Sequence, residues 1–157
     1  GTWTVERDAA SGNVAVLRRT PAGSDDRVVL TAELPVRSTA SRGRKLTSVD
    51  IVYEITTAAV TNMLALIRKL AIPANGASIS ATTMAGSVNG DYDSNHDSAA
   101  ERGSTGNHTA TITIGTPAYI GLNDAIEVEL YVYAAATPTA EFDLVGARLN
   151  YDETLVP

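Results

Sequence analysis

The stretch KLTSVDIVYEIT, residues 45–56, decides the fold class, because apolar side chains recur at every second position from Val49 onward. In an extended strand successive side chains point to opposite faces, whereas a helix repeats a face every 3.6 residues. One face of this stretch carries four large apolar side chains: Val49, Ile51, Tyr53 and Ile55. The pattern therefore predicts a β-strand with one buried face.

Two other stretches repeat this alternation. HTATITIG, residues 108–115, alternates threonine with alanine or isoleucine, and AIEVELYVYA, residues 125–134, alternates aliphatic residues with glutamate and then tyrosine. We expect both stretches to be strands whose aliphatic side chains are buried. The other face of the second strand, which we expect to be solvated, carries Glu127, Glu129, Tyr131 and Tyr133.

Three stretches alternate less regularly and are also predicted to be strands: 14–18, 27–34 and 141–151. The last contains Gly146, a residue type that weakens a strand and often marks a bulge. Because a bulge shifts the alternation by one residue, we expect the buried face to change there. The buried residues would be Phe142 and Leu144 before the glycine, and Leu149 and Tyr151 after it.

The stretch TNMLALIRKLAI, residues 61–72, allows two interpretations. Helical spacing is present in Met63, Leu64, Ile67, Leu70 and Ala71. A strand would instead place these residues on one side, with Arg68 as the exception: Leu64, Leu66, Leu70 and Ile72. Turn-like sequence flanks the stretch and the other segments have strand character, so we favour the strand.

Glycine, proline, asparagine and aspartate separate these stretches, as they do in turns between antiparallel strands. The chain has 157 residues and no cysteine, so we expect one domain, 1–157, held together by packing without disulfides. About eight short strands predict an all-β, antiparallel β-sandwich of jelly-roll type, with a closed barrel as the alternative. Residues 1–12 are expected to form a short N-terminal arm that docks on a partner.

Charge is unevenly distributed along the chain. Residues 1–45 carry eight basic and five acidic side chains, whereas residues 46–157 carry four basic and thirteen acidic ones. The basic stretch RSTASRGRK has no aromatic residues to stack on bases, and the chain is acidic overall, so we expect no nucleic acid as a partner. No apolar run approaches the ~18 residues of a transmembrane helix, so we expect no membrane partner either.

The stretch DYDSNHDSAAERG, residues 91–103, is the strongest candidate for a metal site. It opens like an EF-hand calcium loop, but His96 stands where that loop needs glycine and Arg102 where it needs glutamate. Two alternatives remain open. In the first, an irregular calcium site uses Asp91, Asp93, Asp97 or Glu101. In the second, these side chains form turns and cap a short helix through Asp97 or Ser98.

Catalytic motifs are not found in the sequence. His96 and His108 are the two histidines, so we expect no catalytic zinc unless several chains share one. The pentapeptide G-x-S-x-G and the glycine-rich phosphate loops are missing. Glu127 and Glu129 would project to one side, as a glycosidase pair does, but the solvated face of an amphipathic strand explains them more simply. We expect neither enzymatic activity nor a cofactor.

Contact with a partner is the remaining way for the chain to act. Trp3, the single tryptophan, either anchors an interface or folds back over its own sandwich. Two tyrosines offer large amphipathic surfaces, and the basic stretch would attract an acidic partner. The candidate partner-binding residues are Trp3, Arg37, Arg42, Arg44, Lys45, Tyr131 and Tyr133.

Three segments together resemble small structural proteins encoded by tailed phages: KLTSVDIVYEITTAA, HDSAAERGSTGNHTATITIGTPAYIGLNDAIEVEL and FDLVGARLNY. The resemblance covers roughly residues 45–151. It implies a virion component whose β-sandwich assembles as a homo-oligomer. It also implies that HDSAAER is a turn that Asp97 caps, with Glu101 and Arg102 free to form local or intersubunit pairs.

From this resemblance we expect a decoration, or cement, protein on the capsid surface, assembled as a trimer. Such a protein bridges neighbouring major capsid subunits and stabilises the head. The alternative is a tail fibre, spike or head-fibre domain that binds a host receptor or a glycan. An enzyme such as a depolymerase is the least expected function.

Overall fold

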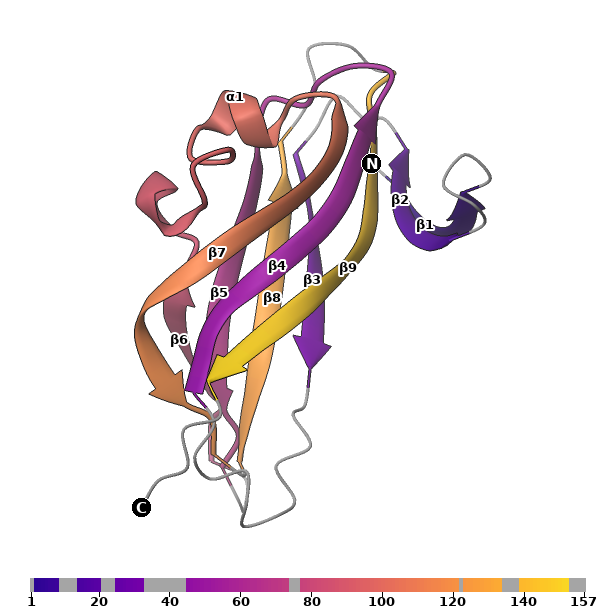
Figure 1. Ribbon diagram of the computed structural model, residues 1–157. Coiled ribbons are helices and arrows are strands. Elements are labelled where there is room, and N and C mark those ends of the chain that lie inside the picture. Colours follow the sequence, from indigo (N-terminus) through magenta and orange to yellow (C-terminus); the bar gives the residue numbers. More distant parts are fainter. Residues whose placement is uncertain are drawn as a thin grey trace.

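The structure is a computed structural model in which two antiparallel sheets face each other, so the expected all-β sandwich is confirmed (Figure 1). It describes residues 2–8, 14–20, 25–32, 45–73, 77–121, 123–133 and 139–152. Among these residues, no helix has the length and apolar character needed to cross a membrane.

Each sheet combines strands from distant parts of the chain. The five-stranded sheet has the order β1 (Thr2–Asp8), β2 (Val14–Thr20), β9 (Glu141–Asp152), β4 (Lys45–Thr56) and β7 (Gly106–Tyr119). The four-stranded sheet has the order β3 (Asp26–Ala32), β8 (Asp124–Val132), β5 (Met63–Ala71) and β6 (Ser80–Ala85). Two short helical turns, η2 (Asn89–Asp91) and α1 (Ala99–Arg102), lie between β6 and β7.

The strand pairing is nested. β2 pairs with β9, β3 with β8, β4 with β7 and β5 with β6, each time antiparallel. The first half of the chain thus pairs with the second half in reverse order. This nesting brings both halves of the chain into each sheet, so the core between the sheets contains residues from the whole length of the chain.

The core confirms the alternation of the first three predicted strands. In β4, four side chains are at most 1% exposed: Val49, Ile51, Tyr53 and Ile55. Opposite them, the four-stranded sheet contributes Ile126, Val128, Leu130 and Val132 of β8, all buried. Burial of such side chains at about 25 cal/mol per Å² is the main stabilising term of the fold.

The expected bulge in β9 is confirmed. Along the pairing with β4, Val52 lies opposite Gly146 and Tyr53 lies opposite Leu144, so Val145 is an extra residue on β9. Phe142 and Leu144 are buried before this point. Beyond it, the half-buried side chains that pack on the core are Leu149 and Tyr151.

Residues 63–71 form a strand, as favoured, but the expected apolar face was wrong. Met63, Ala65 and Ile67 are fully buried, whereas Leu64 and Leu66 on the other face are half-buried. Register with β8 causes this, because Ala65 lies opposite Leu130 and Ile67 opposite Val128, both core residues. The expected face, with Leu70 and Ile72, instead follows the outer surface of the sheet.

Glu129 on β8 is also not solvated, contrary to expectation, since its side chain is 2% exposed. Arg27 Nη1 lies 3.0 Å from Glu129 Oε1, and Arg68 Nη1 lies 2.6 Å from Glu129 Oε2. Tyr131 Oη donates to Glu129 Oε1 at 2.8 Å. Because β8 is a central strand, long side chains from β3 and β5 cover the carboxylate and pair with it.

Residues 2–8, part of the expected arm, form strand β1, which pairs with β2 along seven residue pairs. β2 in turn pairs with β9 at only three positions, from Leu17 to Arg19. Figure 1 shows β1 and the adjoining part of β2 standing out to one side of the sandwich. Trp3 is half-buried and meets the Phe142 ring edge-on at 6.2 Å, so it folds back over its own sandwich.

Candidate functional site

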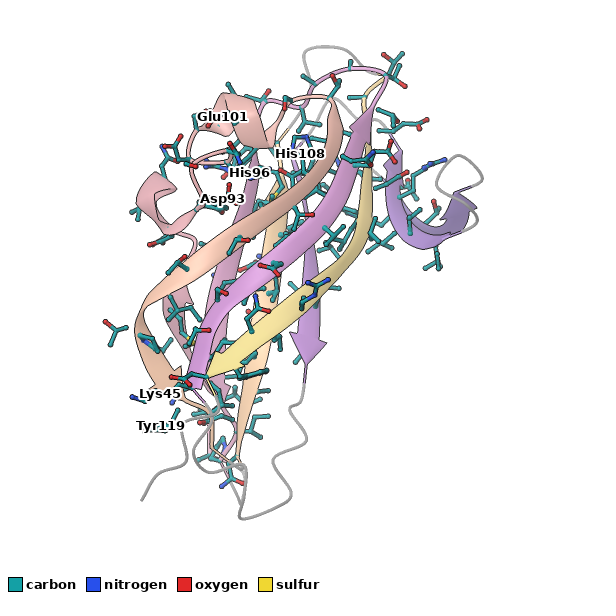
Figure 2. All side chains as sticks on the ribbon, viewed as in Figure 1. Lys45, Asp93, His96, Glu101, His108 and Tyr119 are labelled. Atoms are coloured by element: carbon teal, nitrogen blue, oxygen red, sulfur yellow. The ribbon has the colours of Figure 1, made fainter. Side chains whose placement is uncertain are left out.

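Many polar contacts gather in the link between β6 and β7, residues 86–105, which continues where β6 ends. β6 pairs with β5 only from Ile67 to Ala71. Beside the first half of β5, the link takes the place of a strand and satisfies the backbone with side chains. Figure 2 shows this segment, with α1, at one end of the sandwich.

Tyr92 satisfies the edge of β5. Its hydroxyl accepts a hydrogen bond from the Ala65 amide at 2.8 Å and lies 3.3 Å from the carbonyls of Ala65 and Gly86. Its backbone forms an isolated bridge to Ile112 of β7. Burial raises the pKa of Tyr92, which keeps the hydroxyl protonated and able to donate.

Arg102 is 1% exposed, so it is not free to form intersubunit pairs as expected, and its contacts lie within the chain. Its donors reach the carbonyls of Met63 (2.8 Å) and His96 (2.7 Å) and the side-chain oxygens of Asn62 (3.2 Å) and Asn89 (3.0 Å). The guanidinium also lies over the Tyr92 ring, 4.3 Å from its centroid. The planar fork of arginine thus joins β5, η2 and the turn before α1.

Ser98, not Asp97, caps α1. The Ser98 side chain accepts from the Glu101 amide, and the Glu101 carboxylate accepts from the Ser98 amide at 2.9 Å, which completes a capping box. Hydrogen bonds from Ser98 lower the pKa of Glu101. Asp97, beside this carboxylate, has a raised pKa, caused by its hydrogen bond with Glu101 and by the charge of Glu101.

Asp93 anchors the link to β7. Its Oδ2 accepts from the Thr111 amide at 2.7 Å, and its Oδ1 accepts from the Asn95 amide at 3.0 Å. The ring of His96 is also in contact, with Nδ1 2.9 Å from Oδ1. Burial pushes the pKa of Asp93 up, but the hydrogen bonds from Thr111, His96 and Asn95 outweigh it and hold the pKa below its usual value.

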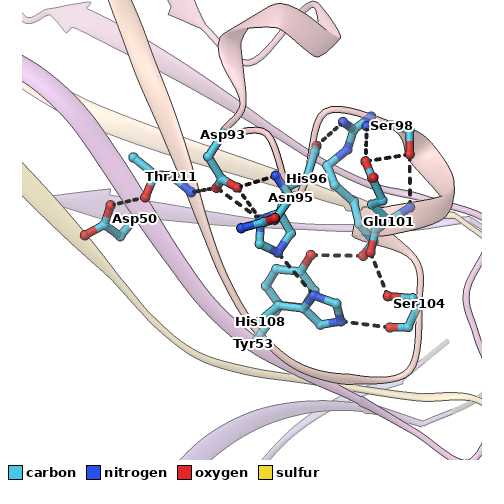
Figure 3. Close-up of polar contacts among 11 residues, drawn as sticks. Asp50, Tyr53, Asp93, Asn95, His96, Ser98, Glu101, Ser104, His108 and Thr111 are labelled. Atoms are coloured by element: carbon cyan, nitrogen blue, oxygen red, sulfur yellow. Dashed lines mark hydrogen bonds and ion pairs between the residues drawn. The ribbon is translucent and has the colours of Figure 1, made fainter.

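The two histidines continue this chain of contacts, as Figure 3 shows. His96 Nε2 lies 3.2 Å from His108 Nδ1, and His108 Nε2 lies 2.9 Å from the Ser104 carbonyl. The Tyr53 ring stacks on His108 with 4.7 Å between centroids and 10° between planes. Burial lowers the pKa of His108, against an opposing effect of the Ser104 carbonyl.

The carboxylates of the link favour the turn interpretation over the irregular calcium site. Asp91 accepts from the Gly86 amide at 2.7 Å, and Asp93 forms the turn described above. Glu101 is held by Ser98. Within the described ranges, no three His, Cys, Asp or Glu side chains gather closely enough to hold a metal ion.

The expected partner-binding residues that the structure describes do not form one surface. Arg37, Arg42 and Arg44 lie outside the described residues. Lys45 lies over the Tyr119 ring at 4.7 Å, at one end of β4. Trp3 packs on Phe142, which pairs with Ile55 of β4. Because Ile55 lies ten residues after Lys45, the usual rise of a strand puts Trp3 about 30 Å from Lys45. Tyr131 and Tyr133 are half-buried, and Tyr131 is bound to Glu129.

An apolar groove that the sequence did not indicate lies where β1 and β2 extend beyond the four-stranded sheet. Val5 pairs with Leu17, and Leu17 with Leu144, so all three side chains share the inner face of the larger sheet. The open groove, about 220 Å³ in volume, is lined by residues that include Val5, Ala15, Leu17, Leu30 and Val145; we call it the edge groove. Val5 is 80% exposed.

The structure thus offers two features outside the core: the polar network of the link and the edge groove. In the network, the hydrogen bonds join segments of the fold to one another, so the network holds the link in place against β5 and β7. The edge groove is apolar and open, which suits contact with another macromolecule. No family model and no curated protein matches this chain.

Proposed function

We propose that the chain is a structural protein of a tailed-phage virion that acts by contact: a capsid decoration protein that bridges neighbouring major capsid subunits. The resemblance of residues 45–151 to phage structural proteins supports this role. The nested strand pairing supports a jelly-roll topology, which is common among capsid proteins. In this role the chain would assemble as a homotrimer on the capsid surface.

The observation that carries the proposal is the edge groove. Val5 is 80% exposed although it shares a face with the buried Leu144, because β1 extends beyond the facing sheet. Exposed apolar surface of this kind marks a contact site on a soluble protein. We propose that an apolar segment of the major capsid subunit packs into the groove, so that docking buries the inner face of β1.

The test is sedimentation of the purified chain with purified capsid shells. Val5→Asp places a charge in the groove without disturbing the core, and we expect it to weaken shell binding at least about tenfold. Ile79→Asp is the matched control, because Ile79 is also largely exposed, at 63%, but does not line the groove. We expect it to bind as the unmodified chain does.

Two outcomes would contradict the proposal in different ways. If Val5→Asp binds shells normally while the unmodified chain binds, the groove is not the docking surface. If the unmodified chain does not bind shells, decoration is not its function. A positive signal on a glycan array would then favour the alternative, a fibre domain that recognises a host receptor.

A further inference from the structure

Three contacts join four residues in series, in the order Asp93, His96, His108 and Ser104. Each contact requires one proton. The Asp93 carboxylate and the Ser104 carbonyl only accept hydrogen bonds, so the ring nitrogens that face them, His96 Nδ1 and His108 Nε2, must carry protons. The contact between His96 Nε2 and His108 Nδ1, at 3.2 Å, needs one further proton, and only one, between the two nitrogens.

Two neutral imidazoles carry only two ring protons, whereas the series of contacts needs three. With two protons, one contact must place a lone pair against another acceptor. With four, two N–H groups face each other between the rings. The complete series therefore exists only when the histidine pair carries one positive charge.

We propose that Asp93, His96 and His108 form a proton-dependent clasp that fastens the β6–β7 link to β4 and β7 and is closed only in the singly charged state. In this state we place both ring protons of the charged imidazole on His96, because its Nδ1 faces the Asp93 carboxylate, so that His108 Nδ1 accepts from His96 Nε2. The clasp is independent of the capsid role, since it concerns how the link is held to the sandwich.

The charged groups around the pair are consistent with one charge and not two. Within the link, hydrogen bonds from the Thr111 amide and from His96 hold the pKa of Asp93 below its usual value, and Glu101 and Asp97 add negative charge nearby. From α1, the Arg102 guanidinium donates to the His96 carbonyl and opposes a second positive charge.

The remaining neighbours of the clasp come from β4, β7 and η2. From β4, the Tyr53 ring stacks on His108 and stays neutral, because burial raises its pKa. Asp50 of β4 reaches the site only through Thr111 of β7, whose hydroxyl it binds at 2.9 Å. From η2, the carboxylate of Asp91 is engaged by the Gly86 amide.

The stability that the clasp contributes should be greatest at an intermediate pH. The lowered pKa of His108 contributes stability that is present above its unfolded value of about 6.5 and is lost as pH falls through the folded value. In the other direction, the proton that the series requires is lost as pH rises, and one contact opens. Stability contributed by the clasp therefore declines on both sides of the singly charged state.

The direct test is ¹⁵N NMR of the two imidazoles in the full chain between about pH 5 and 8, where histidine changes charge. We expect a pH interval in which both nitrogens of His96 carry protons while His108 carries one on Nε2 only. If both rings are neutral throughout, or if His108 carries its proton on Nδ1, the clasp does not exist.

A variant gives a second readout. His108→Phe keeps a ring to stack on Tyr53 but removes both nitrogens. The protection factor of the Thr111 amide, which is its intrinsic exchange rate divided by the observed rate, should therefore lose its maximum at intermediate pH. In the unmodified chain we expect this protection factor to fall about threefold to tenfold on each side of its maximum, as the loss of one hydrogen bond allows. Asp97→Asn, which removes a nearby charge outside the series, should keep the maximum in the protection factor.

An identical pH profile in His108→Phe and the unmodified chain would overturn the proposal. If His108→Phe does not fold, His96→Gln supplies the same comparison, because it retains a donor toward Asp93 but removes the titrating ring. The NMR measurement on the unmodified chain decides the question without either variant.

Discussion

Gly86, the residue at which the β6–β7 link begins, is required by both space and conformation. Its φ is +89°, and a Cβ there would lie 1.7 Å from the Ala65 carbonyl oxygen on β5. Gly86→Ala must therefore push the link away from β5 and break the contacts of Tyr92. We expect a loss of at least about 2 kcal/mol in the free energy of unfolding, measured by urea denaturation.

Gly90 is the matched control for this substitution. It belongs to the same link, in η2, but a Cβ there would meet no atom within 4 Å. Gly90→Ala should change stability by less than about 0.5 kcal/mol, as surface substitutions usually do. Equal effects of the two substitutions would show that the link does not pack on β5 as described.

Arg102 supports a second prediction at this scale. Arg102→Met retains length and apolar volume but removes the donors that satisfy the buried carbonyls of Met63 and His96. Each buried acceptor left without a partner costs about 1–3 kcal/mol, so we expect a loss of about 3 kcal/mol in stability. Arg148→Met is the control: its side chain is 73% exposed and should matter by about 0–1 kcal/mol. A similar loss in both variants would contradict the buried role of Arg102.

The role of Arg102 could not be read from the sequence. Its neighbours in the chain, Ala99 to Gly103, indicated only a short helix with an arginine in its last turn. Its acceptor on β5, the Met63 carbonyl, lies 39 residues away, and sequence patterns carry no signal for such a pairing. The two histidines pose the same difficulty, because their contact depends on how the link folds back on β7.

At the scale of elements, α1 depends on its cap, because four residues are too short to form a stable helix alone. Ser98→Ala removes the side chain that accepts from the Glu101 amide, and we expect a loss of about 1 kcal/mol, measured by thermal unfolding. Asp97→Ala should be neutral or slightly stabilising, because it removes a carboxylate that is crowded by Glu101. A larger loss at Asp97 would make that residue the cap.

Sequence alternation located the strands whose two faces have different surroundings. β4, β7 and β8 were found because one face is buried and the other is polar. β6 gave no signal, since its first four residues are exposed on both faces. The buried face of β5 was misjudged because its outer face is also rich in leucine, and only register with β8 decides which face points inward.

At the scale of the molecule, the last strand that the structure describes lies in the interior of a sheet. β9 lies between β2 and β4, and the Arg18–Asp143 pair across β2 and β9 joins residues 125 positions apart. Nested pairing of this kind requires closure of a long loop before the sheet is complete. Folding should therefore be slow for a chain of this size, in the range of other β-sandwiches.

This placement predicts unequal effects of truncation at the two ends. A chain that ends at Ala140 loses β9, which leaves the adjoining edges of β2 and β4 unpaired and removes the buried Phe142 and Leu144 from the core. We expect no cooperative thermal transition by circular dichroism. A chain without residues 1–8 loses only the outermost strand and the Trp3 contact, and should unfold cooperatively with stability lower by about 2 kcal/mol. If the C-terminal truncation folds as well as the N-terminal one, β9 does not complete the core. Because the sandwich should fold without β1, the exposed apolar face of this strand needs another explanation, which a docked partner supplies.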